Sequence, residues 1–405
     1  MSNENQHIPS GYKPSPLGII PEDWEVKRLG KVGEVFSGGT PNTEIQEYWN
    51  GNIDWCTPTD ITLLNGAVYI ERTAFKITDL GLKSSSAVLL PPNSIIVCTR
   101  ATIGNAAISL HQIATNQGFK NIVPNENIDT LFLYYTIVNN KIRLIRLGNG
   151  STFLEVSKSD FENLTIPVPP LSEQQRIVSV LSLWDTAIEK QTALIEKLTL
   201  RKRGLMQQLL TGKKRLKGFG GEWKEVRLGE IARITMGQSP DSKYYNEIGL
   251  GLPLIQGNAD IQDKKSIQRF WTSSITKTCE GGDIIMSVRA PVGEIAIATQ
   301  KSCIGRGVCA IKNTSIEKKY LYQLLLFEED SWKNIEQGGT FTAINSNEIR
   351  NKAVIIPATD EQNAIASVLV NADKGIEIQK QKLAAMQEQK KGLMQVLLTG
   401  KRRVK

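Results

Sequence analysis

Residues 172–217 read SEQQRIVSVLSLWDTAIEKQTALIEKLTLRKRGLMQQLLTGKKRLK, and residues 360–405 read DEQNAIASVLVNADKGIEIQKQKLAAMQEQKKGLMQVLLTGKRRVK. The two segments align without a gap at a constant offset of 188 residues and share the run GLMQxLLTGK. An ungapped match of this length is not expected by chance. The chain therefore contains an internal repeat, and these two segments decide how its fold is organised.

Both segments carry a narrow apolar stripe that predicts a long helix. Apolar side chains recur in alternating steps of four and three residues, which is the spacing of a coiled-coil seam. A glutamine stands at the same step in each copy and is expected to fix the register of a helix pair. The main predicted seam positions are Ile177, Leu181, Ile188, Gln191 and Ile195 in the first copy, and Ile365, Leu369, Ile376, Gln379 and Leu383 in the second.

The ends of both helices are marked in the sequence. Ser172 and Asp360 are expected as N-caps, and Gly212 and Gly400 as stops. Because a globular part lies between the two segments, an antiparallel pair related by a pseudo-twofold axis is the simplest arrangement. Ordinary core helices that each pack on their own domain are the alternative.

The segments before these helices also match. Trp24-x3-Arg28-Leu29-Gly30 recurs as Trp223-x3-Arg227-Leu228-Gly229, and IIVCTRATIG at 95–104 recurs as IIMSVRAPVG at 284–293. Short β-like runs near 94–98 and 283–288 and helix-like stretches at 130–147 and 317–336 indicate a mixed α/β composition. The predicted fold is α+β, with globular domains at 1–171 and 218–359 separated by an antiparallel coiled coil of helices at 172–217 and 360–405.

The charge of the chain is concentrated in the repeated helices. The 405 residues include 49 Lys and Arg against 41 Asp and Glu, a net charge of +8. Ten basic and four acidic residues lie in 172–217, and nine basic and five acidic residues lie in 360–405. The globular parts are therefore close to neutral, so net charge argues only weakly for a nucleic-acid partner.

Composition excludes several classes of protein. Histidine occurs only as His7 and His111, which removes most His-dependent catalysis and metal binding. The five cysteines include no CxxC pair and are expected as free thiols in a reducing compartment. The N-terminus has no apolar signal region and no run approaches the ~18 apolar residues of a membrane span. We therefore expect a cytoplasmic protein that does not bind a membrane.

The repeated motifs resemble one family. The opening GYKPSPLGIIPEDWEVKRLGKVGEVFSGGTP, the segments IIVCTRATIG and IIMSVRAPVG, and the helix start IPVPPLSEQQRI are similar to DNA-specificity (S) subunits of type I restriction-modification systems, over residues 12–405. The resemblance implies two target-recognition domains that each read one half of a split double-stranded DNA site, with the paired helices as a spacer. It also implies two modification subunits, which carry S-adenosylmethionine and methylate adenine, and restriction subunits that use ATP and Mg²⁺.

No catalytic motif accompanies these features. The chain contains no G-x4-G-K-[ST] run and no Asn-Pro-Pro-aromatic motif of an adenine methyltransferase. The acidic string at 22–27 faintly resembles a nuclease motif, but solvated charges beside a packing tryptophan explain it better. We therefore expect a non-catalytic subunit without a cofactor or metal of its own. A self-contained methyltransferase or nuclease and a coiled-coil adaptor without sequence preference are the alternatives.

Candidate DNA contacts lie in loops at matched positions of the two copies. Arginine and the amides Asn and Gln are the common readers of guanine and adenine, while hydroxyls and backbone N–H groups hold phosphates. Each loop also has a purely structural interpretation, as a plain turn or as an arginine paired with a carboxylate. The candidates are Gly38, Gly39, Thr40, Arg100, Thr102, Asn116, Gln117, Ser151 and Thr152 in the first copy, and Gly237, Gln238, Ser239, Arg289, Arg306, Gly339 and Thr340 in the second.

Overall fold

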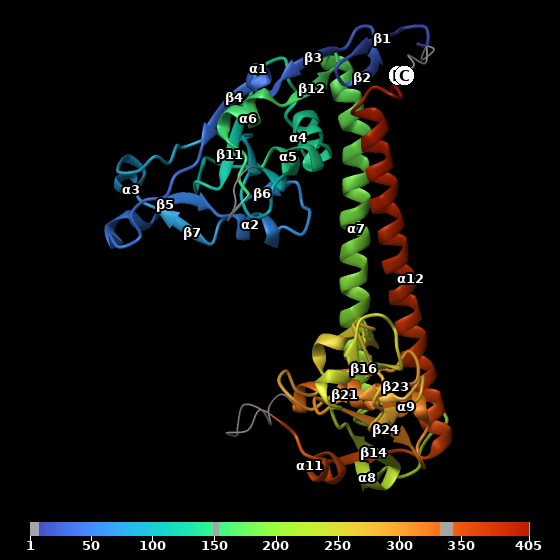
Figure 1. Ribbon diagram of the computed structural model, residues 1–405. Helices are drawn as coiled ribbons and strands as arrows, with labels where there is room; N and C mark the ends of the chain where they lie inside the picture. The colour runs from blue at the N-terminus through green and yellow to red at the C-terminus, as the bar shows by residue number, and fades with distance from the viewer. Residues whose placement is uncertain (1–7, 149–153, 333–342, 405) are drawn as a thin grey trace. The chain divides into compact units, whose positions relative to one another are not determined.

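The chain forms two compact units in a computed structural model that describes residues 8–148, 154–332 and 343–404. Unit 1 comprises residues 1–193 and 381–405, and unit 2 comprises residues 194–380. Each unit therefore consists of one globular part together with one end of each of two long helices, α7 and α12 (Figure 1).

Unit 1 is built on a five-stranded sheet in the order β4-β11-β8-β9-β6, with a three-stranded sheet β10-β5-β7 and two strand pairs, β1-β2 and β12-β3. Its central strand β8 is buried on both faces, as its uninterrupted apolar run predicts. The strands are β1 Tyr12–Ser15, β2 Gly18–Pro21, β3 Glu25–Arg28, β4 Gly33–Ser37, β5 Trp49–Cys56, β6 Tyr69–Ile70, β7 Phe75–Ile77, β8 Ile95–Cys98, β9 Ala106–Ser109, β10 Ile113–Thr115, β11 Phe119–Pro124 and β12 Thr165–Val168. The short helices are α1 Leu29–Val32, α2 Pro58–Leu63, α3 Asp79–Lys83, α4 Thr130–Asn139, α5 Lys141–Leu147 and α6 Lys158–Asn163.

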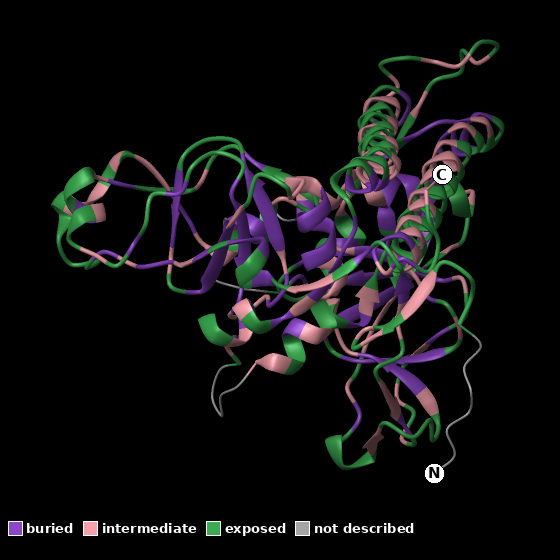
Figure 2. Ribbon diagram, turned by 90° about the horizontal axis from the view of Figure 1, so that it is seen from above, coloured by how far each residue is buried: buried purple, intermediate pink, exposed green. Residues whose placement is uncertain are grey.

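Unit 2 repeats this plan with a six-stranded sheet, β14-β24-β21-β22-β18-β17, a five-stranded sheet, β15-β19-β16-β23-β20, and the pair β13-β25. Its strands are β13 Lys224–Arg227, β14 Ala232–Met236, β15 Tyr245–Asn246, β16 Leu252–Ile255, β17 Ile261–Gln262, β18 Lys265–Ser266, β19 Phe270–Thr272, β20 Thr278–Cys279, β21 Ile284–Ser287, β22 Ile295–Ile297, β23 Ser302–Ile304, β24 Val308–Asn313 and β25 Ala353–Ile356. Its short helices are α8 Leu228–Ile231, α9 Lys318–Phe327 and α11 Ser346–Asn351. In Figure 2 the sheets are the regions richest in buried residues.

The two predicted long helices are present, but each begins one residue before and ends eight residues before its predicted range of 172–217 or 360–405. Helix α7 spans Leu171–Leu209 and α12 spans Thr359–Leu397, 39 residues each. Ser172 and Asp360 therefore lie inside the first turn, and their prediction as N-caps was wrong by two residues, because Leu171 and Thr359 are already helical and the N-cap position precedes them. Gly212 and Gly400 follow the helices with φ of 69° and 71°, a conformation that glycine adopts without strain.

Within each unit the two helices run antiparallel and pack on the globular part. In unit 1 the core joins Ile177 and Leu181 of α7 to Leu397 of α12. In unit 2 the core joins Ile365 and Leu369 of α12 to Met206 and Leu209 of α7. The other predicted seam positions, Ile188, Ile195, Ile376 and Leu383, are half-buried. The helices thus form a pair and also complete the domain cores, so both sequence interpretations describe part of the arrangement.

Seam lysines form ion pairs that the apolar pattern does not reveal. Lys202 Nζ lies 2.6 Å from Asp373 Oδ1 in unit 2, and Lys390 pairs with Asp185 at the matched position in unit 1. Each aspartate also binds its globular part, because Gln323 Nε2 donates to Asp373 Oδ2 (2.7 Å) and the Tyr135 hydroxyl donates to Asp185. Gln191 is buried and Gln379 is half-buried. Their role in fixing the register stays a prediction.

A buried carboxylate at the start of each long helix holds the segment that follows the other helix. Glu173, 1% exposed, accepts hydrogen bonds from Trp24 Nε1 (3.0 Å) and from the Arg403 guanidinium (2.5 Å). Glu361 accepts the same pair of contacts from Trp223 (3.2 Å) and Arg215 (2.6 Å). Hydrogen bonds to Glu173 and Asp23 raise the pKa of Arg403. We call this arrangement the Glu173 lock in unit 1.

We expect Glu173→Gln to weaken unit 1 by about 1.5–3 kcal/mol, the usual contribution of a hydrogen bond to a charged group. The amide would remove the buried one of the two carboxylates that pair with the Arg403 guanidinium, whereas Glu126→Gln removes an exposed carboxylate and serves as the control. Urea unfolding followed by circular dichroism measures both variants. Equal stability of the two would show that the Glu173 lock does not stabilise unit 1.

Candidate nucleic-acid interface

The strands β8 and β21 each end in a tight turn that begins with a matched arginine. In unit 1 the turn at 100–104 places Arg100 opposite Glu155 in an isolated antiparallel bridge. Arg100 Nη2 lies 2.7 Å from Glu155 Oε2, and the nearly buried Lys120 lies 3.4 Å from the other carboxylate oxygen. Of the two interpretations of Arg100, the structure supports pairing with a structural carboxylate.

The matched arginine in unit 2 has a different environment. Arg289 forms the same isolated bridge with Ala343, which stands at the position of Glu155. The carboxylate is therefore replaced by a methyl group, and Cys309 replaces the lysine. Arg289 is exposed, and its side chain has no hydrogen bond or ion pair within the described residues. Its guanidinium is available to a ligand.

The loops after β4 and β14 have glycine at 38 and 237 because two backbones pack against each other there. A Cβ on Gly38 would lie 1.9 Å from the Asn116 backbone oxygen, and one on Gly237 would lie 2.1 Å from that of Gly305. The Gly38 and Gly39 N–H groups donate to Phe119 and Thr115 carbonyls. The Gly237 and Gln238 N–H groups likewise donate to the carbonyls of Val308 and Ile304. The expected phosphate site on exposed backbone N–H groups is therefore wrong for these loops.

Two of the four remaining candidates of unit 1 that the structure describes, Thr40 and Gln117, bind each other. The Thr40 hydroxyl donates to the Gln117 side chain, and Asn116 Oδ1 accepts from the Gly118 N–H (2.9 Å). Thr102 lies in the Arg100 turn with a buried hydroxyl that has no partner within the described residues. In unit 2 the matched pair behaves differently, because Ser239 Oγ accepts from the Arg306 backbone N–H (3.0 Å). The Arg306 side chain stays exposed.

A hollow of about 430 Å³ in unit 2 brings Ser239, Arg289 and Arg306 together. We call it the Arg289 hollow. Gln256 forms one wall and is held by two hydrogen bonds, from Ser239 Oγ (2.9 Å) and to the Tyr245 hydroxyl (2.7 Å). Sequence analysis missed Tyr245, Gln256 and Asn258, which also line it. They lie where the two copies no longer align, so no matched position indicated them.

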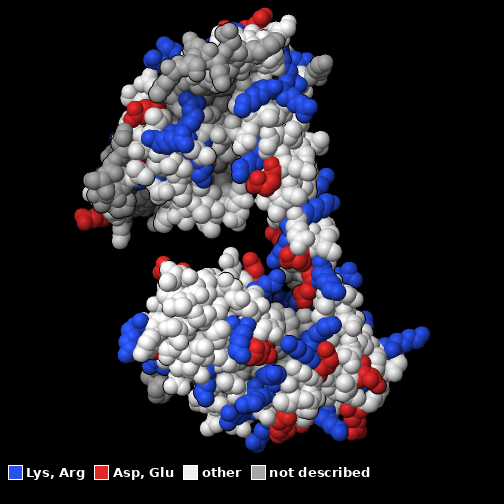
Figure 3. Space-filling view, turned by 45° about the vertical axis from the view of Figure 1, so that its right-hand side comes forward, with Lys and Arg blue, Asp and Glu red and all other residues white. Residues whose placement is uncertain are grey.

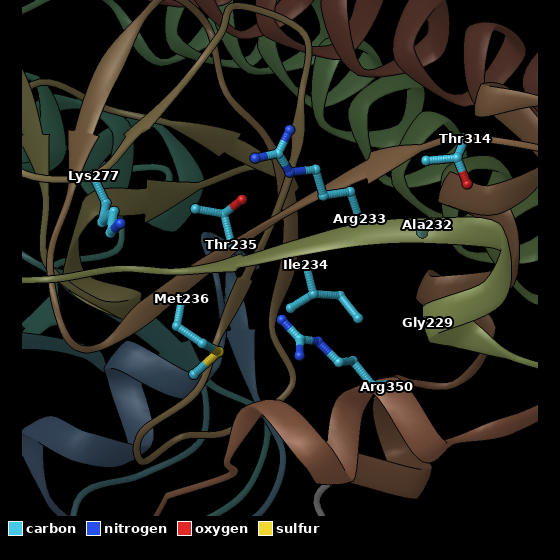
Figure 4. Close-up of a pocket in the computed structure, with 9 residues that line it drawn as sticks. All are labelled: Gly229, Ala232, Arg233, Ile234, Thr235, Met236, Lys277, Thr314 and Arg350. Carbon is cyan, nitrogen blue, oxygen red and sulfur yellow. The ribbon is translucent and has the colours of Figure 1, made fainter.

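A second hollow of about 680 Å³ in unit 2, the Arg233 hollow, follows strand β14. Figure 4 shows Arg233 and Thr235 on one side of this strand and Arg350 on the other, with Lys277 beyond them. Its lining contains three exposed basic side chains, Arg233, Lys277 and Arg350, and no carboxylate within the described residues. Lysine and arginine side chains gathered in this way are typical of contacts with DNA phosphates, which do not read the base sequence.

Several expected sites fall outside these surfaces. Ser151, Thr152, Gly339 and Thr340 lie outside the described residues, so their prediction is not addressed. Across the described ranges, no group of His, Cys, Asp and Glu side chains could hold a metal, and no helix is long and apolar enough to cross a membrane. All five cysteines are free and buried. Burial raises the pKa of Cys98 and Cys279 to about 11, so these thiols stay protonated at neutral pH.

Two units that share a fold but carry different side chains in their loops are typical of a binding protein with two recognition surfaces. Comparison with known proteins agrees with this. Residues 21–200 and 220–388 each match the type I restriction modification DNA specificity domain. The type I restriction enzyme MjaVIII specificity subunit of Methanocaldococcus jannaschii is 26% identical, with 95% of this chain and 94% of the relative covered. The MjaIX specificity subunit of the same organism is 35% identical over 58% of each chain.

A solved structure supports the same conclusion. A chain from a study of complex assembly and conformational transition in a type I R-M system has a TM-score of 0.62 and 26% identity, with 95% of this chain and 99% of that chain covered. The chain described here belongs to the type I restriction-modification DNA specificity family. The predictions of family, of an α+β fold with long helices, and of a DNA-sequence-recognition subunit are therefore confirmed.

Proposed function

We propose that this chain reads a bipartite DNA target, one half with each unit, and directs the modification and restriction subunits of a type I complex to it. The observation that carries the proposal is the double match to the specificity domain, combined with different side chains at matched loop positions of the two units. Gln117 in unit 1 corresponds to Arg306 in unit 2, and Glu155, opposite Arg100, corresponds to Ala343, opposite Arg289. Two readers with the same fold and different loops suit two different half-sites.

The chemistry in this proposal belongs to partner subunits. Two modification subunits would hold S-adenosylmethionine, and restriction subunits would hold ATP and Mg²⁺, while this chain supplies the choice of sequence. Along the paired helices, acidic and basic side chains alternate on the face that Figure 3 shows. Such a mixed surface suits contact with protein subunits better than with DNA alone, because DNA presents only one sign of charge.

A binding measurement on the assembled complex tests the proposal. Adenine methylation across a genome that expresses the whole system identifies the target as a split motif of N6-methyladenine. Equilibrium binding to duplexes with and without this motif, at fixed salt, is then expected to differ by at least about 1,000-fold. Equal binding to all duplexes, with a steep salt dependence, would favour the alternative of an adaptor without sequence preference.

A further inference from the structure

We propose that Arg289 and Arg306 read guanine in the half-site bound by unit 2, and that the matched residues of unit 1, Arg100 and Gln117, do not read bases. This inference rests on the proposed function and assigns specificity to individual side chains. The two guanidinium groups line the same Arg289 hollow, and both are exposed.

The loss of one carboxylate explains why the two arginines differ. Residues directly opposite each other in an antiparallel bridge have Cβ atoms about 4.5–5.5 Å apart, which lets Glu155 hold Arg100 in unit 1. The matched Ala343 cannot accept a hydrogen bond through its side chain. Within the described residues Arg289 therefore keeps all five N–H donors for a ligand, whereas Arg100 gives part of its donors to Glu155.

Arg306 and its matched residue Gln117 also differ in how they bind the neighbouring loop hydroxyl. In unit 1 the Thr40 hydroxyl binds the side chain of Gln117. In unit 2 the matched Ser239 binds the backbone N–H of Arg306 instead, and the exposed Arg306 side chain has no hydrogen bond or ion pair within the described residues. Asp241, the carboxylate in the lining of the hollow, lies 3.2 Å from Lys243 and is thus already paired.

The rest of the hollow favours bases over phosphates as the ligand. Its wall combines a hydroxyl pair, Ser239 and Tyr245, with the amide of Gln256, and the three side chains hold one another in a fixed arrangement. Hydrogen-bond donors and acceptors held in fixed positions suit the edge of a base pair, which presents both donors and acceptors. A phosphate needs only donors, and the Arg233 hollow supplies these without acceptor-rich walls. An arginine that reads a base most commonly binds guanine O6 and N7 together.

Methylation mapping with the assembled complex tests the assignment. Arg289→Gln and Arg306→Gln are each expected to relax the requirement for a G·C pair at one position, all in the same half of the motif. Discrimination against the wrong base pair there should fall by about 5- to 150-fold in duplex binding. Arg289→Lys keeps the charge but replaces the planar fork of parallel N–H donors by a single flexible ammonium group, so it should relax the same position less than Arg289→Gln does.

A variant that keeps the arginine provides an independent test. Ala343→Glu restores the carboxylate found in unit 1 and should capture Arg289, relaxing the same position as Arg289→Gln. Lys319→Gln, which removes an exposed charge of α9 outside both hollows, should leave the motif unchanged. Arg100→Gln should leave the base requirements of the other half-site unchanged, although it is expected to lower the stability of unit 1.

The outcomes separate this assignment from the proposed function. A wild-type complex without any split motif would contradict the proposed function itself. A wild-type split motif that Arg289→Gln, Arg306→Gln and Ala343→Glu all leave unchanged would overturn only the assignment. Uniformly weaker binding by the glutamine variants, with Arg289→Lys indistinguishable from wild type, would identify phosphate contacts and overturn it as well.

Discussion

Replacing residues 218–358 by the corresponding segment of another specificity subunit is expected to change one half of the split DNA target and to leave the other half unchanged. The exchanged segment holds the globular part of unit 2, including both hollows, whereas unit 1 retains its own core. The preference between the old and new half-site should reverse, with a change of about 1,000-fold or more in binding ratio. Methylation mapping of the chimera in an assembled complex provides the measurement.

The chimera folds only if its contacts with the long helices are kept. Within unit 2, Gln362 Oε1 accepts from the Glu317 N–H (2.9 Å), and Gln323 binds Asp373. A donor segment should therefore retain Gln323 and Trp223, because their partners Asp373 and Glu361 lie on α12 outside the exchanged segment. The reciprocal exchange of residues 1–171 is the matched control and should alter the opposite half of the motif. If both chimeras kept the original methylation pattern, bipartite reading by the two units would be refuted.

The second large effect is expected from Trp24→Ala, which should lower the free energy of unfolding of unit 1 by about 3–5 kcal/mol. Trp24 is completely buried. Its ring packs against Gly400, where an added Cβ would lie 3.3 Å from Trp24 Cε3. Truncation therefore opens a cavity and also removes one donor to the buried Glu173. A domain is usually stable by only about 5–15 kcal/mol, so this loss brings unit 1 close to unfolding.

Trp223→Ala is the matched control in unit 2. Trp223 stands at the same position of the repeat but is only half-buried, so its removal leaves a smaller cavity. Urea unfolding monitored by circular dichroism should show a much larger shift for Trp24→Ala than for Trp223→Ala. Equal shifts in the two variants would contradict the conclusion that burial, rather than the shared motif, sets the stabilisation at these positions.

Local pattern was enough to predict the repeat and its long helices. The steps of four and three residues predicted both α7 and α12, because side-chain periodicity follows directly from helix geometry, although both helices end eight residues before the predicted ranges do. The apolar runs at 94–98 and 283–288 likewise predicted β8 and β21, since strands buried on both faces need continuous apolar sequence. The order of the strands was not predicted, because pairing depends on contacts that are distant in sequence.

The candidate site was predicted only in part. Matched loops indicated Arg289, Arg306 and Ser239, which the fold brings to one hollow. The same reasoning could not separate Arg289 from Arg100, because the partner that distinguishes them, Glu155 or Ala343, lies more than fifty residues away in the chain. Gln256 and Tyr245 were missed because they stand outside the aligned part of the repeat.

The sequence alone thus determined that the chain is a duplicated unit with two long helices and resembles a DNA-specificity subunit, because repetition and periodicity are properties of residue order. Only the tertiary structure decided which of the matched arginines pairs with a carboxylate within the described residues. It also showed that the glycines at 38 and 237 allow close backbone packing. The physical reason is that whether a polar group is free depends on the group placed opposite it in space, and folding sets that neighbour.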